Sequence, residues 1–142
     1  MTKLETLEQE AYDNNINVYY RDITLDGFCI KDNVCINKHL GTVKKFWVLE
    51  HELQHLELDQ LYTIESTDKQ VAYRERKVND AIIKKYQLDQ LVLLSLRNGC
   101  DKWETCFECE LPFELYDATL NYLKRKGLMD YEKSFDVAMY EV

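Results

Sequence analysis

Two histidines separated by three residues, with a glutamate directly after the first, are the part of the chain best suited to chemistry. They are His51, Glu52 and His55, in the sequence His-Glu-Leu-Gln-His. Residues four positions apart on an α-helix lie on one face, so His51 and His55 can bind one metal ion together. Glu52 lies about 100° further round the helix, where its carboxylate can reach a water molecule on that metal. The spacing therefore predicts metal-assisted hydrolysis, in which the ion acidifies a water and Glu52 takes the proton.

A second segment offers a third ligand. Glu75 lies between Val71 and Val78, which mark the expected buried face of a later helix. An ionised carboxylate on a buried face needs a partner, and a divalent cation is a strong one. Two histidines and one glutamate are a ligand set of catalytic zinc peptidases, with water in the fourth position. We therefore predict one Zn²⁺ per chain, bound by both histidines of the motif and by Glu75.

Asn79 follows Glu75 by one helical turn, and we predict that its side-chain oxygen accepts the free ring N–H of a ligating histidine. Other interpretations stay open. The motif also fits a surface helix with two solvated histidines. Glu57 and Glu65 are alternative third ligands. Glu75 can instead form an ion pair with one of the cations beside it in the sequence, which are Arg74, Arg76 and Lys77.

The elements that position these residues follow from the pattern of apolar residues. Helical spacing predicts helices over about residues 2–14, 42–60, 68–86 and 88–98, a short one from 101, and one from 112 to 127. Thr42 is the expected N-cap of the second helix, and Asp101 with Glu104 resembles a capping box at the start of the short one. β-branched and aromatic residues predict three strands, at 16–20, 27–30 and 34–36, the last two joined as a hairpin. We expect a small three-stranded antiparallel sheet packed on the helices, an α+β fold.

The length of 142 residues suits one domain, and no repeat or linker divides the chain. We therefore predict a single domain over residues 1–142, which includes the C-terminal helices at about 101–127.

Charge and composition exclude several classes of protein. The chain has 26 acidic and 18 basic residues and a net charge of −8, which argues against direct binding of nucleic acid. No apolar run approaches the roughly 20 residues of a membrane span, and the first residues lack the apolar segment of a secretion signal. We therefore expect a cytoplasmic protein that does not enter the membrane.

The five cysteines are predicted to be reduced thiols, because their number is odd. Three of them lie close together in the sequence, at Cys100, Cys106 and Cys109. They lack a second Cys-x-x-Cys pair or a nearby pair of histidines. We therefore predict buried thiols at these positions and not a second metal site.

A peptide substrate can bind by adding a strand to an exposed sheet edge. The strand that contains Val34, Cys35 and Ile36 is closest in sequence to the helix with the two histidines. We predict that this strand is the edge on which the substrate lies.

With these residues in place, the chain resembles the ImmA/IrrE family of small zinc metallopeptidases of phages and mobile elements. The specific parts are residues 44–55, which contain the two histidines, and residues 75–79, which are similar to the family's Glu-x-x-Ala-Asn stretch. The more generic similarity extends to the hairpin and to two C-terminal helical segments, residues 103–108 and 120–127.

The resemblance implies a zincin-like metallopeptidase core, one zinc ion and a protein substrate, which in this family is typically a helix-turn-helix repressor. Carried over by position, His51, His55 and Glu75 are zinc ligands and Glu52 is the general base. Gln54 stands where the family usually has glycine. We expect its side chain to crowd the substrate groove.

Two functions are consistent with these residues. The first is a zinc-dependent endopeptidase that cleaves the repressor of a phage or mobile element. The alternative is a metallopeptidase-fold binding module that regulates a repressor or a toxin–antitoxin partner without cleaving it. The sequence favours the enzyme, because a structural zinc site needs ligands but does not need a base such as Glu52.

Overall fold

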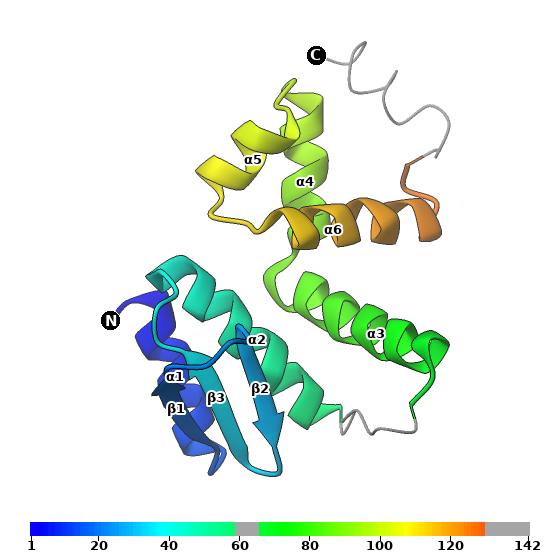
Figure 1. Cartoon of the computed structure of the whole chain (residues 1–142). Helices are drawn as coiled ribbons and strands as arrows, with labels where there is room; N and C mark the ends of the chain where they lie inside the picture. Colours follow the sequence, from blue (N-terminus) through cyan, green and yellow to red (C-terminus); the bar gives the residue numbers. More distant parts are fainter. Residues whose placement is uncertain (59–65, 130–142) are drawn as a thin grey trace. The chain divides into compact units, whose positions relative to one another are not determined.

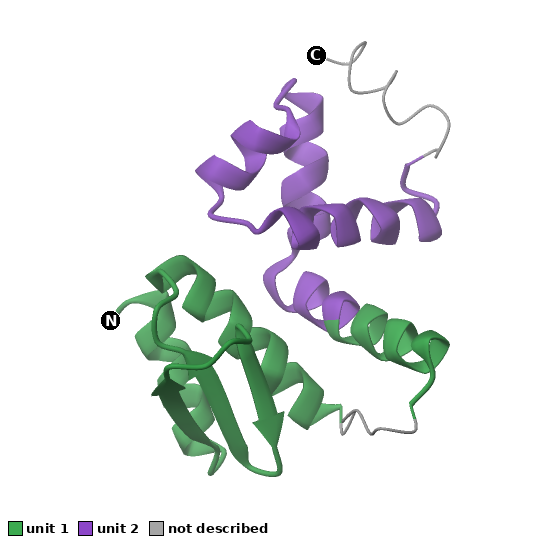
Figure 2. Ribbon diagram, in the orientation of Figure 1, with its two compact units in different colours: residues 1–78 green, residues 79–142 purple. Residues whose placement is uncertain are grey.

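The computed structural model describes residues 1–58 and 66–129, and in this part of the chain it contains six helices and a three-stranded sheet (Figure 1). The chain divides into two units, residues 1–78 and residues 79–142 (Figure 2). Each described unit has buried apolar side chains of its own. The expectation of one domain over residues 1–142 stays a prediction.

The sheet is mixed, with the strand order β1-β3-β2. The strands are β1 (Asn17–Arg21), β2 (Gly27–Ile30) and β3 (Asn33–Asn37). β3 pairs antiparallel with β2 and parallel with β1. The predicted hairpin of β2 and β3 is therefore confirmed, whereas the prediction of an all-antiparallel sheet is wrong. A two-residue turn joins β2 to β3, which runs back alongside β2. β3 lies between β2 and β1 and runs in the same direction as β1.

The central position of β3 also corrects the predicted substrate edge. Val34, Cys35 and Ile36 are hydrogen-bonded to strands on both sides, so they offer no edge to a peptide. Val34 and Ile36 are fully buried, and a strand with two such residues is best accommodated in the middle of the sheet. The edge strands of this sheet are β1 and β2.

Two helices cover one face of the sheet. α1 (Lys3–Asp13) packs on β1, and α2 (Thr42–Glu57) packs on β2 and β3 as well as on α1 (Figure 1). The buried core between these layers contains Leu7, Ala11, Val34, Ile36, Phe46 and Leu49. Along β2, the side chains of Phe28 and Ile30 are exposed while Gly27 and Cys29 are half-buried. This alternation turns Gly27 and Cys29 toward α2.

The ends of the helices are set by local hydrogen bonds. Thr2 and Glu5 form a reciprocal capping box at the start of α1. Thr67 and Gln70 exchange equivalent bonds just before and within α3 (Asp68–Tyr86). Gly41, not Thr42, is the N-cap of α2, without a side-chain bond. The helix that holds the two histidines is therefore positioned by its packing and not by its cap.

The second unit contains the end of α3 followed by α4 (Leu88–Arg97), α5 (Lys102–Glu108) and α6 (Phe113–Arg125). Asp101 caps α5 in a capping box with Glu104, as the sequence predicts. Asp80 on α3 accepts two hydrogen bonds from Arg125 on α6, at 2.8 and 3.1 Å. In the described residues, no helix is both long enough and apolar enough to cross a bilayer.

Candidate metal centre

α2 presents the two histidines on one face and is buried around most of its girth. His55 and Glu52 are both buried, together with Phe46, Leu49 and Glu50 on other sides of the helix. The alternative of a surface helix with two solvated histidines therefore does not describe this chain. The rings of His51 and His55 meet edge to face, with their centroids 4.8 Å apart.

The structure brings Glu75 of α3 to this pair of histidines. The Nε2 atoms of His51 and His55 are 3.2 Å apart. One carboxylate oxygen of Glu75 lies 3.1 Å from Nε2 of His51, and the other lies 3.2 Å from Nε2 of His55. Among the described residues, His51, His55 and Glu75 form a group whose possible metal-binding atoms all lie within 4.8 Å of one another.

Hydrogen bonding alone does not account for these contacts. Each Nε2 atom either carries one proton or offers one lone pair, so it takes part in one good hydrogen bond. Both nitrogens lie in two of the three close contacts, at 3.1–3.2 Å. At most two of the three contacts can therefore be hydrogen bonds. A cation at the centre of the group is attracted by all three ligand atoms at once.

The spacing also fits a zinc ion. Zinc binds histidine nitrogen and carboxylate oxygen at about 2.0–2.1 Å in tetrahedral geometry, which places neighbouring ligand atoms about 3.3 Å apart. The three distances in the group, 3.1–3.2 Å, are close to that value. Two nitrogens and one oxygen are also the donor set that zinc accepts in hydrolytic enzymes. The residues present therefore fit zinc in chemistry and in spacing.

The group is buried on one side and open on the other. The side chain of His55 is 4% exposed, whereas those of His51 and Glu75 are 30% and 34% exposed. The expectation that Glu75 lies in a buried stripe is wrong, because the buried part of α3 begins at Val78. A partly open ligand set leaves room for water and substrate, as a catalytic metal site requires.

Glu52 lies under the sheet, next to β2. Its side chain is largely buried, at 9% exposure, and its carboxylate is near enough to the Cys29 thiol on β2 to raise the pKa of that thiol. The pKa of the Cys29 thiol is raised to about 12, chiefly by burial and in addition by the nearby carboxylate of Glu52. The thiol is therefore protonated at neutral pH.

The proximity of Cys29 to Glu52 was not predicted from the sequence. Its signal was the alternation along β2, which places Gly27 and Cys29 on the same face. A glycine inside a strand often marks the close approach of another element, and here that element is α2.

Gln54 makes a different contact from the one expected. Its amide nitrogen donates to Oε1 of Glu50 at 3.0 Å, and both side chains are buried. The amide is therefore directed along α2 to a neighbour one turn earlier. Crowding of a substrate groove by Gln54 stays untested, but this hydrogen bond gives the side chain a structural role.

The other candidates occupy different positions. Glu57 is exposed and is not part of the converging group, and Glu65 lies outside the described residues. Asn79 is half-buried one turn after Glu75, at the first residue of the second unit, and its predicted bond to a histidine stays a prediction.

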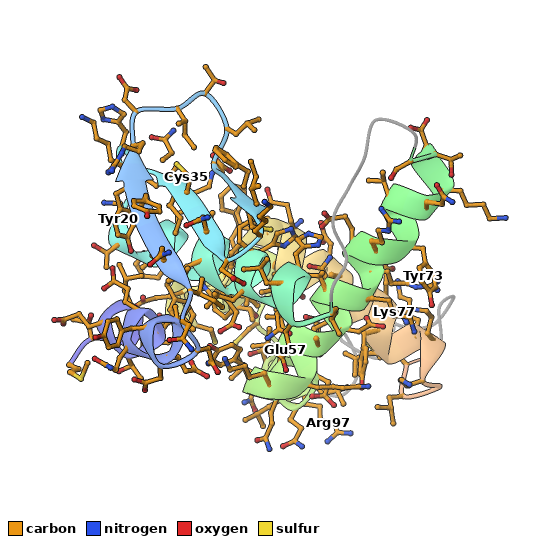
Figure 3. All side chains as sticks on the ribbon, turned by 90° about the horizontal axis from the view of Figure 1, so that it is seen from below. Tyr20, Cys35, Glu57, Tyr73, Lys77 and Arg97 are labelled. Carbon is orange, nitrogen blue, oxygen red and sulfur yellow. The ribbon has the colours of Figure 1, made fainter. Side chains whose placement is uncertain are left out.

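The cations beside Glu75 have contacts of their own. Arg74 donates to the hydroxyl of Ser66 at 3.0 Å. Arg76 and Lys77 lie over the ring of Tyr73, at 5.5 and 5.4 Å from its centroid, and Figure 3 labels Tyr73 and Lys77 along α3. An ion pair with one of these cations stays the alternative explanation for Glu75.

Compared with protein-family models, with curated proteins and with solved structures, the chain gives no match. The likeness to the ImmA/IrrE family therefore depends on the residues quoted from the sequence.

Proposed function

We propose that this chain is a zinc-dependent endopeptidase with a zincin-like core. The observation that carries the proposal is the convergence of His51, His55 and Glu75 beside a buried glutamate, Glu52. A structural zinc site needs no such base, whereas hydrolysis does. The five cysteines are all free, which supports the cytoplasmic location included in the proposal.

In this proposal, His51, His55 and Glu75 hold the ion. When bound, zinc supplies a Lewis acid that acidifies water and polarises a peptide carbonyl. Glu52 takes a proton from the attacking water as the carbon–oxygen bond forms. It then gives that proton to the leaving amine as the carbon–nitrogen bond breaks, so the base is regenerated.

The substrate is proposed to be an extended segment of a protein, bound along the free edge of β2. β2 is an edge strand and packs on α2, so a peptide paired with it would run past the helix that bears Glu52. The exposed side chains of Phe28 and Ile30 offer apolar contacts on the outer face of that strand. Following the family resemblance, we propose a phage-type repressor as the cleaved partner.

The binding-module alternative is favoured by one observation. Two aromatic side chains of α5 are largely exposed, Trp103 at 69% and Phe107 at 82%. Exposed aromatic residues are enriched where proteins bind one another. Such a surface also suits an enzyme that holds a protein substrate, so only an activity measurement separates the two functions.

The test is to load the wild type and Glu52→Gln with one equivalent of zinc and to digest a proteome-derived peptide library with each. Cleavage is read as new peptide termini by mass spectrometry. We expect both proteins to retain about one zinc and only the wild type to cleave. Equal cleavage by both, or a zinc-loaded wild type that cleaves nothing in the library or in a panel of phage repressors, would contradict the proposal.

A further inference from the structure

The exposed side of α5 carries two aromatic side chains that have no part in the metal centre. Trp103 is 69% exposed and Phe107 is 82% exposed. They are four positions apart, so they are neighbours on one face of the helix. The ring of Trp103 also meets the ring of Phe113, the first residue of α6, edge to face with 4.6 Å between their centroids. The aromatic surface therefore extends from α5 to the start of α6, within the second unit.

A row of carboxylates runs beside the aromatic pair. Glu104 and Glu108 each follow an aromatic residue by one position, and both are exposed. One position is about 100° of rotation round the helix, so the acidic row lies next to the aromatic row. We call Trp103, Glu104, Phe107 and Glu108 together the α5 surface. It places an aromatic ring beside a carboxylate twice, one helical turn apart.

The region around this surface is strongly acidic. Residues 101–117 contain six acidic side chains, all exposed, and one basic side chain, which gives them a net charge of −5. The acidic residues are Asp101, Glu104, Glu108, Glu110, Glu114 and Asp117. The basic residue is Lys102, whose ammonium lies 3.0 Å from the carboxylate of Asp117 and 5.1 Å from the ring centroid of Phe113. Within the chain, one cation therefore already binds an aromatic ring and a carboxylate of this region together.

Arginine is the side chain whose chemistry matches both rows of the α5 surface. Its planar guanidinium stacks on an aromatic face and also donates hydrogen bonds to a carboxylate. Lysine carries a compact charge that is more strongly hydrated, so it gains less from stacking on a ring. A row of rings beside a row of carboxylates therefore favours arginine over lysine.

The negative charge argues against other occupants of this surface. A purely apolar partner would bury carboxylates without cations to pair them, which costs free energy. Nucleic acid and anionic lipids would be repelled. A second copy of the chain, joined by a two-fold axis through the same surface, would bring like charges together. A cationic segment of protein complements both the charge and the rings.

From this arrangement we infer that the α5 surface binds an arginine-rich segment of a partner protein. Arginine side chains stack on Trp103 and Phe107 and pair with Glu104 and Glu108. This binding uses no residue of the metal centre, so it goes beyond the proposed function and holds whether or not the chain cleaves its partner.

The first unit supplies matched controls. Glu5 has the same place in the capping box of α1 as Glu104 has in the capping box of α5. Glutamine also serves at that place, so Glu104→Gln and Glu5→Gln each remove one charge and keep the cap. Tyr12 on α1 is 76% exposed and is the control for an exposed aromatic ring.

The probe is a synthetic peptide in which arginine alternates with serine, and the comparison peptide has lysine at every arginine position. Binding to the full chain is measured by isothermal titration calorimetry at low ionic strength, and mass spectrometry checks that the peptide stays intact. We expect saturable binding of the arginine peptide with a Kd below about 100 μM. The lysine peptide should bind at least about threefold more weakly, because it loses the stacking.

The variants locate the peptide on the chain. Trp103→Ala and Phe107→Ala should each raise the Kd about fivefold, because each removes one stacking platform. Glu104→Gln should raise it about threefold through the loss of one ion pair. Glu5→Gln and Tyr12→Ala should bind like the wild type. Circular dichroism checks that each variant is folded, and the two aromatic variants test the same surface independently.

Tryptophan fluorescence tests the contact directly. The chain has two tryptophans, and Trp47 is only 7% exposed, so the solvent-exposed emission comes from Trp103. The arginine peptide should change the emission of the wild type over the same concentration range as the calorimetric titration. In Trp103→Phe, which keeps an aromatic ring, the peptide should still bind while the emission stays constant.

Three results would overturn this inference. The first is the absence of saturable binding of the arginine peptide. The second is equal binding of the lysine peptide, which would leave the rings without a role. The third is a loss of affinity in Trp103→Ala and Phe107→Ala no larger than that in Tyr12→Ala, which would place the peptide elsewhere on the chain. None of these results bears on zinc binding or cleavage, which the Glu52→Gln comparison tests separately.

Discussion

Two groups of potential metal ligands in this chain differ in one decisive respect. In the first unit, His51, His55 and Glu75 come from two helices, and their ligand atoms converge. In the second unit, Cys100, Cys106 and Cys109 are near one another in the sequence, yet they form no converging group among the described residues. Proximity in sequence is therefore a poor guide to which ligand atoms converge, whereas helical spacing combined with a side chain from another element is a better one.

Two thiols of the second unit, Cys106 and Cys109, also favour the protonated form in the absence of a metal. Burial raises the pKa of Cys106, and burial with the nearby charge of Glu108 raises that of Cys109. A metal binds the thiolate form, which such environments disfavour.

The strongest test of this contrast removes one ligand from each group. His55→Ala should lower zinc affinity on the order of a thousandfold, about 4 kcal/mol, because three protein ligands share the binding energy of the ion. Cys109→Ser, the matched control, should leave zinc affinity unchanged. Competition with a chromophoric chelator measures both. Retention of tight zinc binding by His55→Ala would contradict the assignment.

Zinc should also stabilise the fold. At a free zinc concentration about a hundredfold above its dissociation constant, the free energy of unfolding should rise by about 2.7 kcal/mol. Urea unfolding with and without a chelator measures the difference. In Glu75→Ala the stabilisation should shrink, whereas in Cys100→Ser it should persist in full. Zinc-dependent stabilisation that survives Glu75→Ala would remove Glu75 from the site.

The buried pair within α2 should affect stability but not metal binding. Gln54→Ala removes the amide that donates to the fully buried Glu50, and leaving a buried carboxylate oxygen less satisfied should cost about 1–3 kcal/mol. Zinc content should remain at one per chain. If Gln54→Ala is as stable as the wild type in urea, the amide has no structural role and crowding of the groove becomes the better explanation.

The smallest effect is expected in the second unit. Asp80→Ala breaks the bidentate pair with Arg125, whose pKa is raised chiefly by the hydrogen bonds that it donates to Asp80. The pair is partly exposed, so the loss of stability should be about 0.5–1 kcal/mol, and zinc affinity should not change. Asp117→Ala, which breaks a more exposed pair with Lys102, should cost less. If the two variants lose equal stability, the second hydrogen bond between Arg125 and Asp80 adds nothing to the stability of the fold.

The features predicted correctly from the sequence are the local ones. The capping box at Asp101, the β2–β3 hairpin and the placement of His51 and His55 on a helix all depend on residues within a few positions of one another. Local hydrogen bonds and helical spacing decide them, and both can be read from one sequence.

The features that were missed are long-range. The parallel pairing of β1 with β3 depends on which strand occupies the centre of the sheet, and no local signal specifies it. The proximity of Cys29 to Glu52 depends on how β2 packs on α2. The exposure of Glu75 depends on where the buried stripe of α3 begins. Tertiary packing decides each of these, so periodicity alone could not give them.

The most direct test of the metal centre is zinc K-edge X-ray absorption on protein that holds one equivalent of zinc. We predict a first shell of nitrogen and oxygen at about 2.0–2.1 Å, with the multiple-scattering pattern of two imidazoles and no sulfur. A sulfur shell at about 2.3 Å would place the ion on the thiols instead and contradict the assignment of His51, His55 and Glu75.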